Sequence, residues 1–460
     1  MFTRFGRRDK GEGTPSARPV KAEATEAVVP AQPVPPMRSS ALDVIHDEVL
    51  RRIEPSLAVQ LSEEELRRRV AKMIHDIANE RSLLVNQSEQ DNLTVEIVDN
   101  MVGLGPLQPL LNDASLSDIL VNGAKQIYVE RRGRLEQAPF SFRNDAHVLH
   151  IAQRIASMIG RRIDESSPML DARLSDGSRV NVIIPPLSIR GPCVSIRKFS
   201  RSTLDLPRMV EMGTMSPKLV RALEICARSR VNIIISGGTG SGKTTLMNAL
   251  SKKIDVGERV ITIEDTAELQ LQQPHVVQLE TRPPNVEGHG EITARDLVRN
   301  ALRMRPDRII VGEVRGPEAF DMLQAMNTGH NGSMSTIHAN SARDGLVRIE
   351  NMVLMSEVNL PSRAIRAQIA SAIDLVIHLE RMRDGIRRVM DVSEVVGMES
   401  DTITMNPLFT YQYEGENPDG SLRGSYVASG IRPRFLPRAE YFGLADSLIA
   451  SITPEPRGAS

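Results

Sequence analysis

The chain shows three successive patterns of apolar and polar positions. Over residues 41–102, apolar side chains recur every three or four positions, which is typical of amphipathic helices. Ser62 and Glu65 have the spacing of a capping box at the start of the second helix, and Ser88 is a candidate cap for the third. Because isolated helices of this length are only marginally stable, the pattern predicts a small three-helix bundle over 41–102.

The second pattern mixes short alternating runs with one helical run. Residues 117–121, 126–130 and 180–184 predict strands, and residues 147–159 predict a helix. This combination favours an α+β domain over 103–205, followed by a linker over 206–215.

Runs dominated by Val and Ile characterise the third pattern. They occupy residues 231–236, 260–263 and 309–311 and alternate with helical spacing. Apolar strands of this kind belong to a parallel sheet whose two faces are both covered by helices. We therefore expect an α/β fold with a parallel-core sheet over 216–400. The pattern gives no assignment for residues 401–460.

Composition limits the class of protein. The 460 residues include 57 Lys and Arg against 58 Asp and Glu, a balance that argues against direct nucleic-acid binding and against a helicase. Six prolines within residues 11–40 predict a disordered leader over 1–40. No apolar run approaches the roughly 18 residues of a membrane-spanning helix, and with only two cysteines we expect a reducing cytoplasm as the location. Cys193 and Cys226 are too few for a four-cysteine zinc site, and no zinc is expected.

A glycine-rich segment between an apolar run and a helical run is the strongest chemical signal. It matches the pattern G-x-x-x-x-G-K-[ST]. Glycines let backbone N–H groups converge on phosphate oxygens, and the following helix N-terminus favours an anion. The lysine would neutralise β- and γ-phosphate charge, and the next threonine would bind Mg²⁺. We predict that ATP and Mg²⁺ bind at Gly237, Gly238, Thr239, Gly240, Ser241, Gly242, Lys243, Thr244 and Thr245.

Carboxylates end the two later apolar runs. Glu264 follows one run and Glu313 follows the other. The carboxyl ends of parallel strands meet at the ligand edge of a sheet, so both side chains should face the nucleotide. We predict that Glu313 holds Mg²⁺ or its water and that Glu264 orients or deprotonates the attacking water. Asp265 and Glu268 could support Glu264.

Two histidines, His330 and His338, lie eight positions apart in the segment 328–340. With no third ligand evident, a zinc site is rejected. They could sense the γ-phosphate or the coordinated water, or they could be packing or interface histidines.

These motifs resemble those of the secretion-superfamily ATPases, the motors of type II and type IV secretion and of type IV and tight-adherence pili. Residues similar to the family's Walker A motif, Asp box, Walker B motif and His box follow in that order at 237–245, 263–269, 305–315 and 329–340. Residues similar to the CpaF/TadA subfamily, which serves tight-adherence pili, lie at 103–107, 119–123, 191–192 and 195–199.

The resemblance implies a RecA-like ATPase domain preceded by a PAS-like domain, assembled as a homohexamer with nucleotide between the two domains. It also implies that an arginine of the PAS-like domain reaches the γ-phosphate. The candidates are Arg179, Arg190 and Arg197, and Arg197 is the first choice because it follows a strand-like run.

The implied function is ATP hydrolysis that powers assembly of a tight-adherence/type IV pilus at the inner membrane, together with platform proteins of that membrane. Whether such a motor also drives retraction stays open. The alternatives are a type IV secretion motor that exports DNA or effectors, and a nucleotide-gated scaffold with negligible turnover. The basic residues 4–10 also suggest a weak contact with an anionic membrane surface, against the plainer interpretation of a solvated tail.

Overall fold

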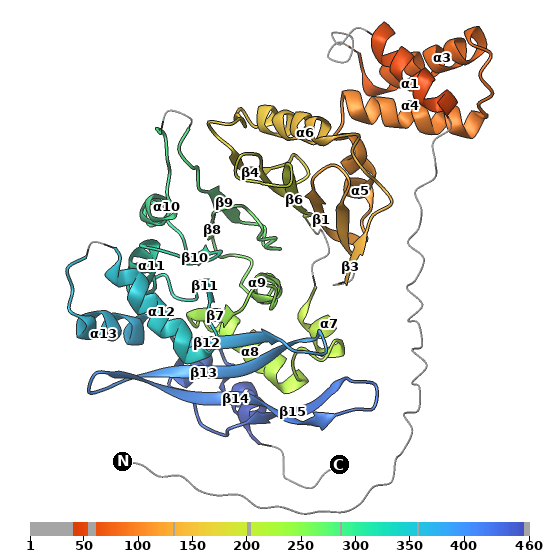
Figure 1. Cartoon of the computed structure of the whole chain (residues 1–460). Helices are drawn as coiled ribbons and strands as arrows, with labels where there is room; N and C mark the ends of the chain where they lie inside the picture. The colour runs from red at the N-terminus through yellow and green to blue at the C-terminus, as the bar shows by residue number, and fades with distance from the viewer. Residues whose placement is uncertain are drawn as a thin grey trace, which may run out of the picture.

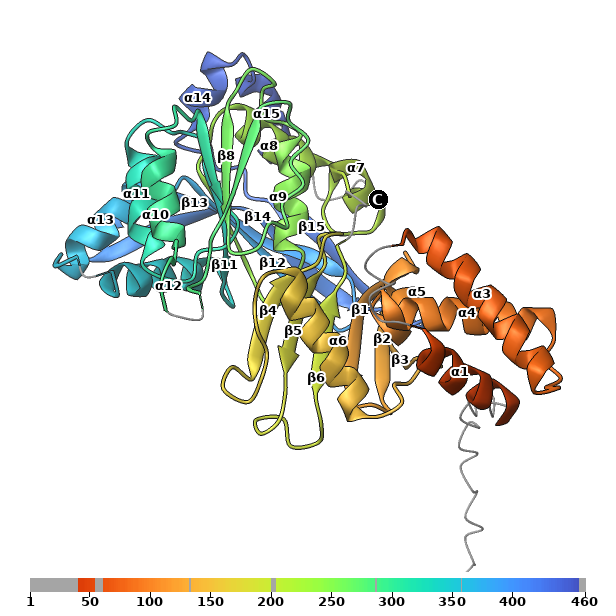
Figure 2. The ribbon, with the colours of Figure 1, turned by 90° about the horizontal axis from the view of Figure 1, so that it is seen from above.

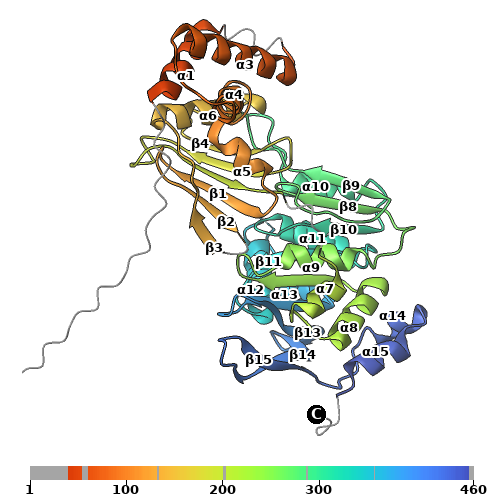
Figure 3. The same ribbon diagram turned by 90° about the vertical axis from the view of Figure 1, so that its right-hand side faces the viewer.

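The computed structural model describes residues 40–53, 61–131, 134–199, 204–285, 288–356 and 358–454. Three units are stacked along the molecule: a helical bundle, a domain with a six-stranded sheet, and a unit with a nine-stranded sheet (Figures 1 and 3). The predicted leader and the basic residues 4–10 lie outside the described residues, except for Ser40. No helix in the described ranges is long and apolar enough to cross a membrane.

The bundle contains three helices around one apolar core. They are α1 (Ser40–Arg52), α3 (Glu63–Glu80) and α4 (Gln87–Met101). Ser62 and Glu65 form the predicted capping box of α3, with the Ser62 N–H donating to Glu65 Oε2 at 3.1 Å. The prediction for α4 is wrong: its N-cap is Asn86, whose Oδ1 accepts from the Glu89 N–H at 2.9 Å, whereas Ser88 lies inside the first turn.

The second unit packs a long helix, α6, on an antiparallel sheet with the order β3-β2-β1-β6-β5-β4. Its elements are η1 (Gly105–Leu107), α5 (Gln108–Asn112), β1 (Leu116–Asn122), β2 (Ile127–Arg131), β3 (Arg134–Gln137), α6 (Asp145–Met158), β4 (Met169–Arg173), β5 (Arg179–Ile183) and β6 (Cys193–Arg197). β5 and β6 pair so that Arg179 lies opposite Arg197 at one end of the hairpin and Ile183 lies opposite Cys193 at the other.

The third unit begins with helices and strands that alternate along the chain. They are α7 (Leu206–Glu211), α8 (Pro217–Arg228), β7 (Ile233–Gly237), α9 (Lys243–Ser251), β8 (Val260–Glu264), β9 (Val276–Glu280), α10 (Ala294–Ala301), β10 (Arg308–Val311), α11 (Glu318–Asn327), β11 (Met334–His338), α12 (Ala342–Leu354) and α13 (Ser362–Ala372). Four strands and two helices complete it: β12 (Leu375–Arg381), β13 (Arg387–Glu399), β14 (Thr402–Glu416), β15 (Leu422–Ala428), α14 (Leu436–Tyr441) and α15 (Ala445–Ile452).

The nine-stranded sheet is mixed, with the order β15-β14-β13-β12-β7-β11-β10-β8-β9. From β12 to β9 all neighbours are parallel, as predicted, while β13, β14 and β15 extend the sheet by antiparallel pairing. Side chains alternate between two cores, so that Ile233 and Ile235 pack with α8 and α9 while Ile234 packs with α11 and α12. Figure 2 shows these helices on opposite sides of the sheet.

Two expected boundaries differ from the structure. Residues 206–215, predicted as a linker, contain α7, and its Leu206 and Met209 are buried in the core of the third unit. The boundary at residue 400 falls between two paired strands of the nine-stranded sheet. Residues 401–460 therefore belong in part to the same sheet and core, because Phe409, Phe435 and Leu448 are buried there.

The parallel order places four chain segments at one edge of the sheet. β7, β8, β10 and β11 run in the same direction, so the residues at their carboxyl ends lie side by side. The glycine-rich loop (237–245), Glu264, Glu313 and His338 all occupy this edge, which faces the second unit.

Candidate functional site

The glycine-rich loop links the end of β7 to the start of α9. Gly242 is the N-cap of α9 and has φ of 98°, a conformation that side chains with a Cβ rarely adopt. Lys243 is buried directly after it and donates from Nζ to the carbonyls of Gly237 at 3.0 Å and Gly238 at 2.8 Å. Burial lowers the pKa of Lys243, and the charge of Glu313 opposes this shift. The ammonium group is thus held against the loop at the N-terminus of a helix.

A pocket of about 590 Å³ opens between this loop and the second unit. The loop contributes Thr239, Gly240, Gly242, Lys243, Thr244 and Thr245; the rest of the third unit contributes Leu204, Asn248, Glu268, Gln270, Glu313, Arg315, Thr336, His338 and Arg387. The second unit contributes Ser117, Asp118, Glu130, Gly177, Arg179, Arg197, Lys198 and Phe199. The lining is therefore rich in cations, carboxylates and backbone N–H groups.

Glu313 lies in this pocket just beyond β10. Its Oε2 accepts from Arg315 Nη2 at 2.8 Å, and its Oε1 lies 3.4 Å from Nε2 of His338. Burial alone would raise the pKa of Glu313, but the Arg315 hydrogen bond and the nearby positive charges outweigh it and lower the pKa. Burial and Lys243 lower the pKa of His338. The site therefore pairs an ionised carboxylate with a histidine whose neutral form is favoured.

Oxygen donors suited to Mg²⁺ line the same pocket as Lys243. The Thr244 hydroxyl and the Glu313 carboxylate line the same pocket, and hard oxygen ligands are those that Mg²⁺ prefers. In the described ranges, no group of three or more His, Cys, Asp or Glu side chains could hold a metal ion alone. This donor set fits an ion that takes its remaining ligands from phosphate and water.

Glu264 lies at the expected strand end, but its carboxylate does not line the pocket. Its Oε2 accepts from the backbone N–H groups of Glu268 at 2.7 Å and Leu269 at 2.8 Å, while Oε1 is buried without a partner. Burial raises the pKa of Glu264 to about 7, and these two hydrogen bonds oppose the rise. Glu264 thus holds the backbone of residues 268–269 in this structure, and its role toward the attacking water stays a prediction. Gly312 makes room for it, since a Cβ there would lie 2.8 Å from Glu264 Cγ.

Glu268 is the carboxylate that the 264–269 segment presents to the pocket. Its Oε1 accepts from Arg179 Nη1 at 2.6 Å, which joins the second and third units. A second ion pair between these units, Arg173 Nη1 to Glu280 Oε2 at 3.1 Å, lies nearby. The sequence gives Glu268 only a supporting role. It lies four positions after Glu264 in an irregular segment, and spacing in such a segment does not reveal which side chain points into the pocket.

The structure separates the three candidate arginines. Arg179 begins β5 and Arg197 ends β6, so the paired strands present both to the pocket. Arg197 Nε lies 3.7 Å from Asp118 Oδ1. Arg190 is exposed in the loop that connects the other ends of these strands and is absent from the pocket lining. The structure therefore gives no support to Arg190 as the arginine that reaches the γ-phosphate.

The two histidines also separate. His338 ends β11 at the pocket edge, whereas His330 precedes β11 and lies near the opposite edge of the sheet. His330 Nδ1 lies 3.2 Å from the Ala325 carbonyl at the end of α11. His330 does not line the pocket of this chain, so its role at the γ-phosphate, or in packing or at an interface, stays a prediction.

Arg387 was not predicted. It begins β13, and its Nε donates to the Gly240 carbonyl at 2.8 Å, across 147 positions of sequence. A small pocket of about 150 Å³ adjoins it, lined mainly by Leu204, Met209, Met212, Thr214, Leu379, Ile386 and the loop residues Ser241, Gly242 and Thr245. The sequence offers no signal for this contact beyond a pair of adjacent arginines.

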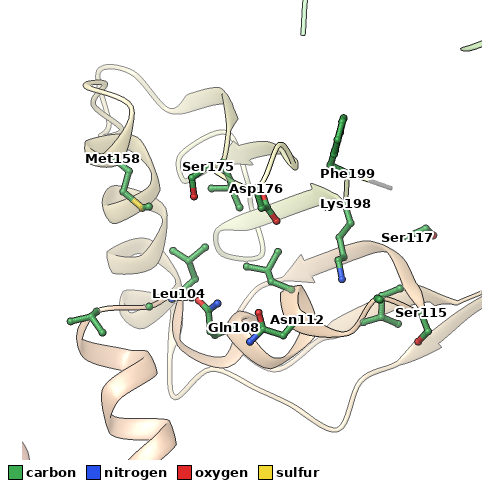
Figure 4. Close-up of a pocket in the computed structure, with 16 residues that line it drawn as sticks. Leu104, Gln108, Asn112, Ser115, Ser117, Met158, Ser175, Asp176, Lys198 and Phe199 are labelled. Atoms are coloured by element: carbon green, nitrogen blue, oxygen red, sulfur yellow. Dashed lines mark hydrogen bonds between the residues drawn. The ribbon is translucent and has the colours of Figure 1, made fainter. Parts of the chain in front are cut away.

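A larger cavity of about 930 Å³ lies within the second unit (Figure 4). Its charged side chains are Lys198 and Asp176. Lys198 donates to the carbonyls of Leu110 and Asp113, and Asp176 accepts from Ser178. Since both charges are engaged and no glycine-rich loop enters, this cavity lacks the features of a phosphate site.

Known proteins resemble the part of the chain that carries this pocket. A family model described as "Type II/IV secretion system protein" matches residues 100–405, which excludes the bundle. A Mycobacterium tuberculosis protein, named provisionally as a conjugal transfer protein, is 37% identical over 299 residues that cover 64% of this chain and 84% of the relative. The type IV secretion system protein PtlH of Bordetella pertussis is 36% identical over 318 residues, covering 63% and 93%. Among solved structures, the VirB11 ATPase of the Brucella suis type IV secretion system is 29% identical, with a TM-score of 0.35 and coverage of 63% and 95%.

Proposed function

The chain belongs to the family of type II/IV secretion system proteins, which are ATP hydrolases, and from this membership we propose that it is a ring-forming motor of a secretion or pilus machine. The pocket between the second and third units carries the proposal. There Lys243 and the glycine-rich loop stand beside two carboxylates, Glu268 and Glu313, opposite Arg179 and Arg197 of the other unit.

Phosphate binding follows from the loop. Backbone N–H groups of residues 237–245 and the N-terminus of α9 favour an anion, and Lys243 supplies a full positive charge. Mg²⁺, when bound, would supply positive charge that stabilises the charge developing on the terminal phosphoryl group. Thr244 and Glu313 would hold it. The apolar pocket of about 150 Å³ behind Gly242 and Thr245 has the lining expected for a nucleobase.

Hydrolysis then needs a group that positions water and a group that stabilises the developing charge. Glu268 is the carboxylate of the 264–269 segment that lines the pocket and is suited to orient water, and His338 and Glu313 line the same pocket. Arg179 and Arg197 would meet the terminal phosphate from the second unit, so hydrolysis would depend on how the two units close. The Arg179–Glu268 ion pair brings a candidate for phosphate contact in the second unit against the candidate for orienting water in the third unit.

Six copies in a ring, a PAS-like second unit and a RecA-like third unit remain parts of the proposal that rest on the family resemblance. So does a position in the cytoplasm against the inner membrane. The names of the relatives favour the proposal that this chain is the motor of a type IV secretion or conjugal-transfer machine. Pilus assembly is the second candidate, because residues 103–107, 119–123, 191–192 and 195–199 resemble the tight-adherence subfamily.

Substitution of the loop lysine tests the proposal. Lys243→Ala should abolish nucleotide binding and reduce phosphate release to background, since the phosphate charge is no longer neutralised. Lys252→Ala, at the other end of α9, is the matched control and should behave as wild type. Normal turnover by purified Lys243→Ala protein would overturn the assignment.

Lys243→Ala also distinguishes the two candidate machines, secretion and pilus assembly, when the gene for this variant replaces the wild-type gene in the cell. Loss of DNA or protein transfer with pili intact supports the secretion motor. Loss of surface pili with transfer intact supports pilus assembly instead.

A further inference from the structure

Topology explains why the start of β13 reaches the glycine-rich loop. β12 is parallel to β7, so it ends at the pocket edge of the sheet, and the antiparallel β13 must begin at that same edge. Arg387 is the first residue of β13 and lies over the loop, where its Nε donates to the Gly240 carbonyl at 2.8 Å.

Charge pairing distinguishes Arg387 from the other three arginines of the pocket. Arg179, Arg197 and Arg315 each have a carboxylate within ion-pair distance. Lys243 and Arg387 donate to carbonyls of the glycine-rich loop, and within the described ranges neither has a carboxylate at that distance. Burial, together with the nearby Arg381, lowers the pKa of Arg387, and the charge of Glu130 opposes this shift; a guanidinium stays charged in proteins. A cation beside a phosphate-binding loop, with no carboxylate within ion-pair distance, is suited to an anion.

The neighbouring turn holds Arg387 in place. Arg388 points to the other side of β13 and forms a bidentate ion pair with Asp384, at 2.9 and 2.8 Å, and both side chains are at most 5% exposed. Asp384 Oδ2 also accepts from the Leu422 N–H of β15 at 3.0 Å. The turn before β13 is thereby fixed to the β14–β15 hairpin, most of which lies beyond the family match at residue 405.

The position of Arg387 indicates which phosphate of a bound nucleotide would lie nearest to it. It lines both the pocket that contains Glu313 and the small apolar pocket behind Gly242 and Thr245. A nucleotide with its base in the apolar pocket and its terminal phosphate near Arg179 would pass Arg387 at the phosphate nearest the ribose.

We propose that Arg387 binds the α-phosphate of the nucleotide, as a contact supplied by the C-terminal strands. This inference rests on the proposed nucleotide binding at the glycine-rich loop. It differs from the role proposed for Arg179 and Arg197, because an α-phosphate is present in ATP and ADP alike. Loss of the Arg387 side chain should therefore lower the affinity for ATP and for ADP by the same factor and leave the rate of the chemical step unchanged.

The test measures the affinity of the full chain for fluorescent ADP and for a fluorescent non-hydrolysable ATP analogue, together with KM and kcat for ATP. Arg387→Ala should weaken both affinities by the same factor, about tenfold for a lost charge-assisted hydrogen bond, and raise KM with kcat changed little. Arg387→Lys keeps the charge and should recover part of the affinity. Arg383→Ala is the control, because Arg383 lies in the same turn but pairs with Glu416, away from the pocket.

Three results would overturn the inference. Wild-type affinity in Arg387→Ala shows that the side chain does not contact the nucleotide. A loss confined to the ATP analogue or to kcat places Arg387 at the γ-phosphate. An equal loss in Arg387→Ala and Arg387→Lys, with a lowered melting temperature in both, shows that Arg387 only braces the loop. Failure of the wild-type chain to bind either nucleotide would instead contradict the proposed function.

Discussion

Glu264 and Glu268 stand four positions apart after β8, and only one of the two carboxylates lines the pocket. Burial raises the pKa of Glu264 to about 7, while two backbone N–H donors oppose the rise and engage its Oε2 in the local fold. Glu268 is about one-third exposed, at 32%, and meets Arg179 across the pocket. At the residue scale, we therefore assign the proposed action on water to the carboxylate that is exposed to the pocket.

Two isosteric substitutions separate these roles. Glu268→Gln should retain ATP binding and lose about a hundredfold or more in kcat, as expected when a group that orients or accepts a proton is removed. Glu264→Gln keeps an oxygen that accepts from residues 268 and 269, so its kcat should fall less than about tenfold. Steady-state phosphate release measures both. A larger fall in kcat for Glu264→Gln than for Glu268→Gln would show that Glu264, and not Glu268, acts on the attacking water.

At the scale of elements, strand direction brings distant segments together. The parallel strands β7, β8, β10 and β11 collect the glycine-rich loop, Glu264, Glu313 and His338 at one edge. The β5–β6 pair delivers Arg179 and Arg197 to the facing side. Only one end of each of these strands reaches the pocket. His330 precedes β11 and Arg190 lies in the β5–β6 loop, both beyond the opposite strand ends, so neither lines the pocket.

The turn that precedes β13 depends on one buried ion pair. Asp384→Ala leaves the Arg388 guanidinium buried without its carboxylate and should lower the free energy of unfolding by about 3 kcal/mol or more. Asp419→Ala, in the exposed β14–β15 turn, removes only local hydrogen bonds to Ser421 and should cost about 1 kcal/mol or less. Urea unfolding of the two variants gives the comparison. Equal losses would show that Arg388 finds another partner.

On the scale of the whole molecule, the third unit is completed by its C-terminal segment. α15 packs against α8, and Phe435, Leu444 and Leu448 fill one of the two cores beside the sheet. The Arg438 guanidinium pairs with Asp374 at 2.6 and 3.0 Å, which ties α14 to the start of β12. The segment after β15 is therefore part of the ATPase unit.

Truncation tests this view. Removal of residues 429–460 exposes the apolar face of α8 and should lower the melting temperature by about 10 °C or more, or prevent soluble expression. Removal of residues 455–460 alone leaves every core residue named above in place and serves as the control. A melting temperature unchanged by the longer truncation would show that α14 and α15 contribute little to the fold.

The sequence alone was sufficient for the features that depend on local order. The glycine-rich loop requires glycines, a lysine and a threonine in fixed succession. The apolar runs of β7, β8 and β10 and the spacing of the bundle helices follow from burial of one or both faces. Glu313 follows from a strand end, because a parallel sheet brings such ends together, whereas the sequence gives His338 only as one of two candidate histidines.

Tertiary structure alone decided which side chains share the pocket. The turn of the chain after Glu264 selects Glu268, and strand pairing selects Arg179 and Arg197 over Arg190. The antiparallel return of β13 brings Arg387 to a loop 147 positions earlier in the chain. Such contacts depend on packing between distant segments, and neither periodicity nor local spacing along one chain encodes the direction in which an exposed polar side chain finally points.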